Sequence, residues 1–409
     1  MKDYEQNLPL IPIARGSGAY LYDFDDNRYL DAISSWWVNL FGHANSTINQ
    51  KLKAQLDTLE HVIFAGFTHE PAIKLASRLV EISPEGLNKV FFADNGSSAI
   101  EIALKMSFQY YKNQGEVRPY FISLENSYHG ETMGALAVGD VSLYKEIYNE
   151  ILIESLQAKS PALCSESEAL ADMERLLKEH KSKVSAVVIE PLVQCAGSMA
   201  MYDASYIRQL KALCEEYGVH LIADEIAVGF GRTGTMFACE QAGISPDFLC
   251  LSKGITGGYL PLSTVLITDD IYNAFYCDYE SGKSFLDSHS YTGNTLACAA
   301  ANATLDIFEE ERIIEKNRAT IELVSKELAT LKGLPHIADI RQRGMIAAIE
   351  LENPDPKRRI NLEVYRYALS QGLLLRPLGN VIYIMPPYII TKEQIELIFS
   401  VIRGAIKRL

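Results

Sequence analysis

The chain has 409 residues, of which 48% are hydrophobic and 22% are charged, which is ordinary usage for a globular protein. A chain of this length exceeds the size at which one hydrophobic core stops growing, so we expect a large domain and at least one smaller one. The formal net charge of −14 argues against nucleic acid as a partner, because binding to a phosphate backbone depends on clustered Lys and Arg.

Residues 1–50 are expected to form an N-terminal arm and part of a small domain, and residues 51–300 a large domain. Between about residues 86 and 270 the chain repeats a short apolar run, a polar turn and a helical pattern, which is typical of βαβ units. The expected strands are Val90 to Ala93, Tyr120 to Leu124, Val184 to Ile189, His220 to Ala223 and Phe248 to Leu251, and the expected helices are 98–113, 167–182 and 203–217.

These units predict an α/β fold whose mostly parallel sheet is covered on both faces. In such sheets ligands bind outside the carboxyl ends of the strands, so the residue after each apolar run is where chemistry is expected. Residues 301–409 change character and predict a smaller α+β domain. Its expected elements are a long helix from Glu309 to Lys332, a strand after Gly344, a strand, turn and strand from Leu373 to Met385, and a last helix behind the capping box Thr391-x-x-Gln394.

The cysteines do not form a disulfide framework: there are seven of them and no C-x-x-C pair. We expect them to be core thiols in a reducing compartment. No apolar run approaches the length of about 18 residues that a membrane span needs, and the first residues lack the apolar region of a signal peptide. We therefore expect a cytoplasmic enzyme with small-molecule substrates, without a membrane, nucleic-acid or metal partner.

Two charged residues at expected strand ends carry the strongest signal. Asp224 ends the run that begins at His220, and Lys253 follows the next run 29 residues later. A carboxylate in such a place can hold a pyridine nitrogen protonated, and a lysine can form an imine with an aldehyde and then shuttle a proton. The alternative is that both residues make ordinary ion pairs at the surface.

Two further segments predict contacts with the same ligand. A strand runs through Gly96 and Ser97 into a helix with Ser98-x-x-Glu101 as an expected capping box, and free amides at a helix start favour a phosphate. An ordinary capped helix is the alternative. Tyr128, after another strand, is placed to stack on a pyridine ring, or else to fill the core of a loop.

Together these motifs resemble those of the subgroup III pyridoxal-phosphate (PLP) aminotransferases of fold type I. The resemblance covers nearly the whole chain, and its motifs occur in the family's order and spacing. They are Asn95-Gly-Ser-Ser98, Tyr128-His-Gly130, Glu190-Pro191, Asp224 to Gly234, Ser252-Lys-Gly254 and Tyr291-Thr-Gly-Asn294.

The resemblance implies a role for each matching residue. Lys253 is the lysine that binds PLP as a Schiff base, Asp224 is the partner of the pyridinium nitrogen, and Tyr128 stacks on the cofactor ring. Glu190 lies near the cofactor, unless it is simply an acid at a strand end. The cofactor phosphate is held by Gly96, Ser97 and Ser98, and by Ser290 from the other subunit of an obligate homodimer with shared sites. The large domain, 51–300, is then the PLP-binding domain.

Within that family, four segments resemble the biotin-pathway diaminopelargonate aminotransferases: Ser34-Ser-Trp36-Trp37, Phe41-Gly-His43, Arg376-Pro-Leu-Gly379 and Ile382 to Pro387. Those enzymes transfer the amino group of S-adenosylmethionine to 8-amino-7-oxononanoate and give 7,8-diaminononanoate. The resemblance implies that Trp36 and Trp37 wall the substrate pocket and that Arg376 meets a substrate carboxylate. The alternative for the tryptophan pair is core packing, and the alternative function is a related aminotransferase that acts on lysine, ornithine or an ω-amino acid.

Two departures from the family pattern occur. Thr295 stands where the family usually has proline, and we expect little effect at this turn position. The chain also starts a few residues later than most members, which leaves Tyr4 as the candidate for the aromatic of their N-terminal arm.

Overall fold

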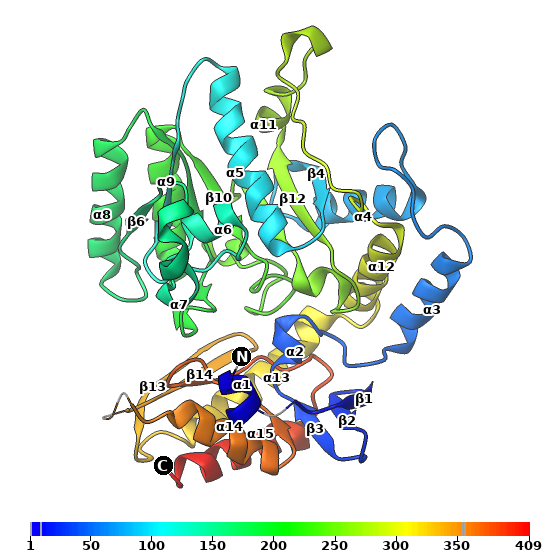
Figure 1. The fold of residues 1–409 in the computed structure, drawn as a ribbon, viewed down its shortest axis with the longest axis vertical. Helices are drawn as coiled ribbons and strands as arrows, with labels where there is room; N and C mark the ends of the chain where they lie inside the picture. Colours follow the sequence, from blue (N-terminus) through cyan, green and yellow to red (C-terminus); the bar gives the residue numbers. More distant parts are fainter. Residues whose placement is uncertain (1, 9, 354, 356) are drawn as a thin grey trace. The chain divides into compact units, whose positions relative to one another are not determined.

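The structure, a computed structural model, describes every residue except 1, 9, 354 and 356, and the side chains of Asp3 and Tyr4 lie outside its description. The role expected for Tyr4 therefore stays a prediction. The described chain forms two compact units (Figure 1). We call residues 51–306 the large unit, and residues 1–50 with 307–409 the small unit.

The large unit is built on a seven-stranded sheet. Its strands, in spatial order, are β4 (Leu87–Ala93), β12 (Ser263–Thr268), β11 (Phe248–Leu251), β10 (His220–Asp224), β7 (Val184–Ile189), β5 (Tyr120–Leu124) and β6 (Leu156–Ala158). The five strands from β11 to β6 are parallel, whereas β12 runs antiparallel to both β11 and β4. The expected α/β fold with a mostly parallel sheet is confirmed.

All five strands expected in the large unit are present in the seven-stranded sheet, and the other two strands of this sheet were not predicted. β6 has only three residues, which is too short for its pattern to stand out. β12 is a β-branched run, Ser-Thr-Val-Leu-Ile-Thr, that is reached without an intervening crossover helix, so the βαβ pattern does not include it.

Helix α5 (Gly96–Asn113) is central to the core of the large unit. It packs on β11, β12 and β7, where its small residues Ala99 and Ala103 are fully buried together with Val188 and Ile222 of the sheet. The other expected helices are α8 (Glu166–Glu179), which packs on β6, and α9 (Ala204–Tyr217), which packs on β10 (Figure 1). The remaining elements are short or peripheral: α4 (Glu70–Ile82), α6 (Met133–Val138), α7 (Ser142–Lys145), α10 (Cys239–Ala242), α11 (Asp269–Asn273), the 3₁₀ turns Glu146–Ile151, Lys253–Thr256 and Tyr279–Ser281, and the pair β8 (Val193–Gln194) and β9 (Ala200–Met201).

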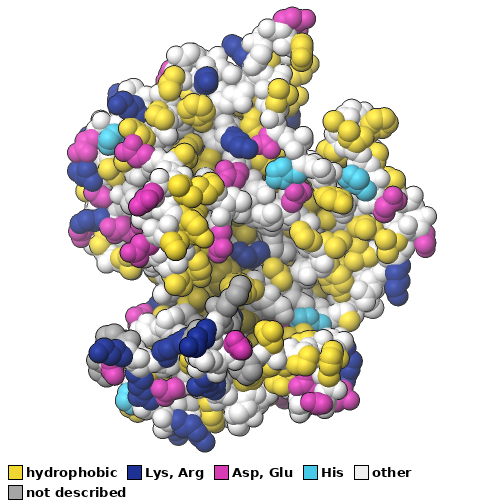
Figure 2. Space-filling model, viewed as in Figure 1, with side chains coloured by type: hydrophobic (Ala, Val, Ile, Leu, Met, Phe, Trp, Pro, Cys, Tyr) yellow, Lys and Arg dark blue, Asp and Glu magenta, His cyan; other side chains and the backbone are white. Residues whose placement is uncertain are grey.

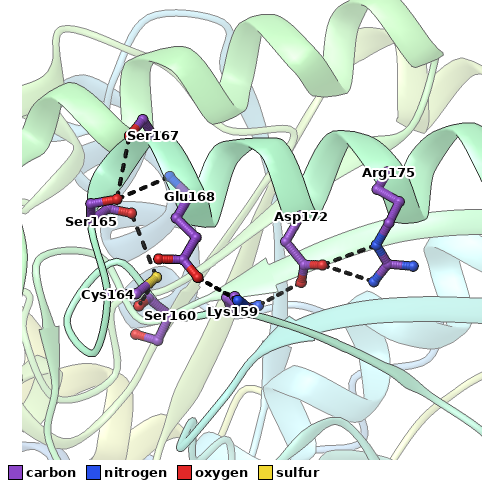
Figure 3. A network of polar contacts seen from close by, with 8 residues as sticks. All are labelled: Lys159, Ser160, Cys164, Ser165, Ser167, Glu168, Asp172 and Arg175. Carbon is purple, nitrogen blue, oxygen red and sulfur yellow. Dashed lines mark hydrogen bonds and ion pairs between the residues drawn. The ribbon is translucent and has the colours of Figure 1, made fainter.

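A polar network fixes the start of α8 at the β6 edge of the sheet (Figure 3). The backbone N–H of Lys159, directly after β6, donates to Asp172 Oδ2 at 3.0 Å, and the Lys159 ammonium pairs with Glu168. Asp172 also accepts from Arg175 Nη2 at 2.8 Å, and the Ser165 hydroxyl accepts from the Glu168 N–H as the helix cap. Because these ion pairs are mostly exposed, they contribute to local order more than to stability.

The small unit contains two sheets. Strands β1 (Ile13–Ser17), β2 (Tyr20–Asp23), β3 (Arg28–Asp31) and β15 (Leu373–Leu374) form one, and β13 (Ile337–Arg343), β14 (Ile346–Leu351) and β16 (Val381–Ile384) form the other. The expected strands between Leu373 and Met385 are present, but they belong to different sheets, since β15 pairs with β3 and β16 pairs with β14.

The helices of the small unit are α1 (Lys2–Asn7), the single turn α2 (Ser34–Trp37), α13 (Ile313–Ala329), α14 (Ile360–Ser370) and α15 (Lys392–Ile406). α15 begins with the expected capping box, Thr391 and Gln394. The helix expected from Glu309 to Lys332 is present as α13, but its predicted start is too early. Glu309 and Glu310 belong to α12 (Thr295–Glu310), and Arg312, with φ of 50°, separates the two helices.

Two helices, α3 (Ser46–Leu56) and α12, contain a boundary between the units. Thr295 is the first residue of α12, a position at which helices also accept proline.

Among the described residues no helix is long and apolar enough to cross a membrane. All seven cysteines are free thiols and five are buried, but Cys277 is exposed, so the expectation of core thiols is wrong for it.

Candidate active site

Three of the predicted site residues come from neighbouring strands of the large unit. Asp224 is the last residue of β10, Lys253 is the second residue after β11, and Glu190 directly follows β7. Since β7, β10 and β11 are adjacent and parallel, their carboxyl ends lie at one edge of the sheet. The order of the strands therefore brings together an amine and two carboxyl groups, at the place where α/β sheets bind ligands.

Asp224 is a buried carboxylate, with 5% of its surface exposed. Its Oδ2 lies 2.8 Å from His129 Nδ1, and its Oδ1 accepts the backbone N–H of Ile226 at 3.1 Å. Because an ionised carboxylate only accepts hydrogen bonds, we assign the proton of this pair to His129 Nδ1. The other ring nitrogen, Nε2, is buried and has no hydrogen-bond partner among the described residues.

Lys253 is held in a strained conformation. Its φ of 44° lies in the left-handed region, which is unfavourable for a side chain with a Cβ. Such strain is typical of residues whose position matters for function. Burial lowers the pKa of the Lys253 ammonium, and the opposing charge of Asp224 only partly compensates. A larger fraction of this amine is therefore neutral than of a lysine in water, and only the neutral amine is a nucleophile or a base.

Glu190 connects two loops around the site. Its Oε1 accepts the backbone N–H of Tyr128 at 3.0 Å, and its Oε2 accepts that of Cys195 at 3.0 Å. Burial raises the pKa of Glu190 to about 7, although His129 acts in the opposite direction. Both carboxylate oxygens of Glu190 thus bind backbone N–H groups, so Glu190 positions the segment that carries Tyr128.

The start of α5 differs from the expected cap. Ser98-x-x-Glu101 is not the capping box: the N-cap is Asn95, whose Oδ1 accepts the Ser98 N–H at 3.1 Å, because the helix begins two residues earlier than predicted. Glu101 instead accepts the N–H groups of Gly134 and Ala135, at 2.6 and 3.2 Å, and so caps α6.

The start of α5 offers backbone amides in a space shaped by glycine. A Cβ on Gly96 would lie 2.9 Å from Ile226 Cγ2, and a Cβ on Gly130 would lie 2.6 Å from the Ser97 Cβ. Gly130 also has φ of 125°, which favours glycine. The first N–H groups of a helix have no acceptor within the helix, so those of Gly96 and Ser97 are available to a phosphate.

The partly buried Tyr128 is fixed at both ends. Its backbone is held by Glu190, and its hydroxyl donates to Glu131 Oε1 at 3.1 Å. The ring centroid lies 5.2 Å from that of Tyr144, with the planes tilted by 59°. Burial raises the Tyr128 pKa, so the hydroxyl stays protonated. The contact with Glu131 was not predicted, and no sequence pattern distinguishes it from an ordinary exposed acid.

Ser290 is exposed and lies on the loop that leads to α12. Its neighbour His289 is anchored, with Nδ1 2.6 Å from Asp94 Oδ2. Exposure is what a residue offered to a second subunit requires. Arg232, in the loop after Asp224, is fully buried.

The predicted substrate residues lie in the small unit and differ in their surroundings. Trp36 is 48% exposed, and the Arg376 guanidinium carbon lies 4.4 Å from its ring centroid. Trp37 is only 4% exposed and packs edge to face on Tyr383, with centroids 6.0 Å apart. Trp36 and Arg376 thus form one surface, whereas Trp37 is part of the core of this unit.

Comparisons with known proteins show the family of the chain. The profile of the family described as aminotransferase class-III matches residues 1–406. The chain is 54% identical to a Helicobacter pylori protein named adenosylmethionine-8-amino-7-oxononanoate aminotransferase, over 96% of this chain and 91% of that one. It is 43% identical to a protein of the same name from Geobacter sulfurreducens, over 97% and 91%.

Solved structures show the same fold. The crystal structure of the enzyme of that name from Methanocaldococcus jannaschii matches with a TM-score of 0.96 at 40% identity, over 100% of this chain and 95% of that one. A PLP-bound amine transaminase from an uncultivated Pseudomonas species matches with a TM-score of 0.91 at 31% identity, over 98% and 95%. The expected fold type I is confirmed.

Proposed function

The chain belongs to the class-III aminotransferase family, and from this premise we propose that it uses PLP to transfer the amino group of S-adenosylmethionine to 8-amino-7-oxononanoate, which gives 7,8-diaminononanoate. The observation that carries the proposal is the group of Lys253, Asp224 and the start of α5 at one edge of one sheet. The names of the relatives that are 40% to 54% identical support the choice of substrates.

The residues at the sheet edge fit PLP in three independent ways. The amides of Gly96 and Ser97 suit its dianionic phosphate, and the buried carboxylate of Asp224 suits a protonated pyridine nitrogen. The amine of Lys253, whose pKa is lowered, suits its aldehyde. When bound, PLP supplies an electron sink for the charge that develops on the carbon of the donor amine.

The residues of the chain perform the rest of the chemistry. Lys253 Nζ carries a proton to and from the reacting carbon, which requires an amine that loses its proton easily. Asp224 keeps its negative charge close to the ring nitrogen, and the hydrogen bond from His129 fixes its orientation. Tyr128, anchored through Glu190 and Glu131, offers its ring as a wall of the cofactor site.

Trp36 and Arg376 are proposed to recognise the two substrates. The exposed indole face of Trp36 offers stacking to adenine and attraction to a sulfonium cation, worth about 0.5 to 2 kcal/mol. The planar guanidinium of Arg376 suits the terminal carboxylate of the keto acid. Trp37 stays in the proposal as a wall of the pocket, although its burial also fits the packing alternative.

A related amino transfer from lysine, ornithine or an ω-amino acid is the competing function. The structures of ω-transaminases from Pseudomonas jessenii share the fold, with TM-scores of 0.94, but at only 26% identity. The substrates named for the closer relatives are therefore the better proposal. The cytoplasmic location expected from the sequence stays a prediction.

An absorbance titration tests the proposal. In the PLP-loaded protein, S-adenosylmethionine is expected to change the visible spectrum of the cofactor, and 8-amino-7-oxononanoate is expected to reverse the change. Lysine, ornithine and a simple ω-amino acid serve as matched donors. If only ornithine or the ω-amino acid changes the spectrum, the choice of substrates is wrong while the aminotransferase activity stands.

We also propose a homodimer whose two sites each use Ser290 of the neighbouring subunit. The exposure of Ser290 supports this, as does the apolar surface of the large unit. Figure 2 shows hydrophobic side chains gathered over the loop between α3 and α4, where Ile63 and Phe67 are 59% and 65% exposed. Exposed apolar groups of this kind mark association surfaces.

Subunit mixing tests the shared site. A Lys253→Ala chain is combined with a Ser290→Asp chain, in which the new charge repels a phosphate. If the sites are shared, the heterodimer has one site with both changes and one with neither, so its activity exceeds that of either homodimer. No gain, with subunit exchange confirmed by mass spectrometry, contradicts the sharing.

A further inference from the structure

Helix α2 of the small unit has an unusual backbone. Its four residues, Ser34, Ser35, Trp36 and Trp37, have φ values of 51°, 44°, 74° and 74°. Consecutive residues of this kind form a left-handed turn, which each Cβ disfavours because it approaches the following carbonyl oxygen. None of the four residues is glycine, so other interactions must stabilise the turn.

The carboxylate of Asp31 supplies the main interaction. Asp31 is fully buried at the end of β3, and its Oδ1 accepts the N–H groups of Ile33 and Ser35 at 3.2 and 3.0 Å. Its Oδ2 accepts the Ser35 hydroxyl at 2.7 Å and faces His43 Nε2 at 3.1 Å. Burial raises the pKa of Asp31, but the hydrogen bonds from His43 and Ser35 outweigh it, so the pKa is lowered and the carboxylate stays ionised.

The imidazole of His43 is itself fixed. Its backbone exchanges two hydrogen bonds with Gly18, and a Cβ on Gly16 would lie 2.5 Å from the Cβ of His43, so the main chains are in close contact. The Asn39 amide nitrogen lies 3.1 Å from His43 Nδ1. Because the amide nitrogen of Asn39 can only donate, Nδ1 of His43 accepts. We therefore assign the ring proton to Nε2, which donates to Asp31.

The turn is also anchored on its other side. The Ser34 hydroxyl donates to the carbonyl of Met385, directly after β16, at 2.7 Å. Trp37 is buried against Tyr383 of that strand. Three of the four side chains are therefore held, and the fourth, Trp36, is the exposed one that faces Arg376.

We propose that Asp31 and His43 are positioning residues for substrate recognition, because they hold Ser34–Trp37 in the left-handed turn that sets the Trp36 ring beside Arg376. The proposal rests on the function proposed for Trp36 and Arg376. Without the carboxylate, the turn loses the acceptor of both hydrogen bonds from Ser35, Ile33 before the turn loses its own acceptor, and the strain is no longer balanced. The alternative is that Asp31 only stabilises the fold of the small unit.

Fluorescence reports the position of Trp36 directly. The chain has two tryptophans, so in a Trp37→Phe background all tryptophan emission comes from Trp36. In the PLP-loaded protein, Asp31→Asn is expected to lower the anisotropy of Trp36 and to increase its quenching by acrylamide. Asp26→Asn is the matched control, since Asp26 is an exposed carboxylate of the same unit that pairs with Arg15.

Kinetics report the consequence for recognition. Asp31→Asn is expected to raise the KM of the substrates about tenfold, the size of one lost hydrogen bond to a charged group, with a smaller change in kcat. His43→Gln keeps a donor for Asp31 and is expected to retain most of the wild-type values, whereas His43→Phe follows Asp31→Asn. Ser35→Ala is the milder variant should Asp31→Asn fail to fold, and it is expected to shift Trp36 in the same direction.

The outcomes distinguish the positioning role of Asp31 and His43 from the recognition role of Trp36. If the variants lower the melting temperature but leave Trp36 anisotropy, quenching and KM at wild-type values, the positioning role is wrong. If Trp36→Ala has wild-type KM for every substrate, the role proposed for Trp36 is wrong. In that case the fluorescence arm still decides whether Asp31 holds the turn.

Discussion

The sheet edge of the large unit and the tryptophan turn of the small unit place functional side chains in opposite ways. At the sheet edge, Asp224, Glu190 and Lys253 end regular parallel strands, and only Lys253 has a strained backbone. In the turn, four consecutive residues are left-handed and one carboxylate holds them. The groups proposed to bind and activate the cofactor are thus positioned by regular geometry, whereas those proposed to select the substrates depend on a local conformation.

The largest effect is expected at the centre of the sheet edge. Lys253→Ala is expected to reduce turnover by about 10² to 10⁴ or more, because proton transfer and covalent chemistry need one amine. The phosphate contacts at α5 are unchanged, so the variant is expected to fold and to retain PLP noncovalently. Rapid-mixing absorbance measures the reaction, and gel filtration measures retention. Lys89→Ala, a partly exposed lysine of the same unit, is the control. Turnover at the wild-type rate contradicts the mechanism.

The tryptophan pair tests whether the turn combines packing with recognition. Trp37→Ala is expected to lower the free energy of unfolding of the small unit by about 3 to 5 kcal/mol, because it leaves a cavity beside Tyr383. Trp36→Ala is expected to change stability little and to raise the KM of the substrates. Thermal unfolding and steady-state kinetics of both variants give the comparison. Equal losses of stability would assign both side chains to the core.

Asp224→Asn sharpens the contrast between binding and chemistry at the sheet edge. A neutral amide does not stabilise a pyridinium, so we expect the rate of amino transfer from the donor to fall about a hundredfold, as for the loss of one preorganised electrostatic contact. PLP retention is expected to fall less, since the phosphate contacts remain. An unchanged rate of the half-reaction would remove Asp224 from the site.

The smallest effect is expected from Glu225, the residue that follows Asp224 in the chain. It is fully buried and accepts the N–H groups of Ala238 and Cys239, at 2.6 and 2.8 Å. Burial raises its pKa to about 7, above the ordinary 4.5. The folded protein therefore binds this proton more tightly than the unfolded chain, and stability falls as pH rises from about 4.5 to 7.

Glu225→Gln removes this titration. We expect the variant to lose less stability than the wild type between pH 5 and pH 8, by about 1 to 3 kcal/mol. Glu190 keeps its own titration in both proteins, so some pH dependence remains. Melting temperatures across this range give the measurement, and an unchanged profile would mean that Glu225 is ionised throughout.

Much of the sheet edge could be predicted from local patterns. Alternating apolar runs and helical periods are properties of neighbouring residues, and they correctly placed β5, β7, β10, β11 and α5. The carboxyl ends of parallel strands then follow from the handedness of βαβ units, so Asp224 and Lys253 could be assigned to one edge before any coordinates were known.

Other features were decided by contacts between segments far apart in the chain. Ser98 and Glu101 have the spacing of a capping box, yet Asn95 starts the helix and Glu101 caps α6, because a carboxylate binds whichever amides the fold brings to it. Trp36 and Trp37 are adjacent and chemically identical, so no sequence pattern separates the exposed ring from the buried one. Their difference comes from the left-handed turn, which Asp31 stabilises locally and which contacts with Tyr383 and Met385, far along the chain, anchor.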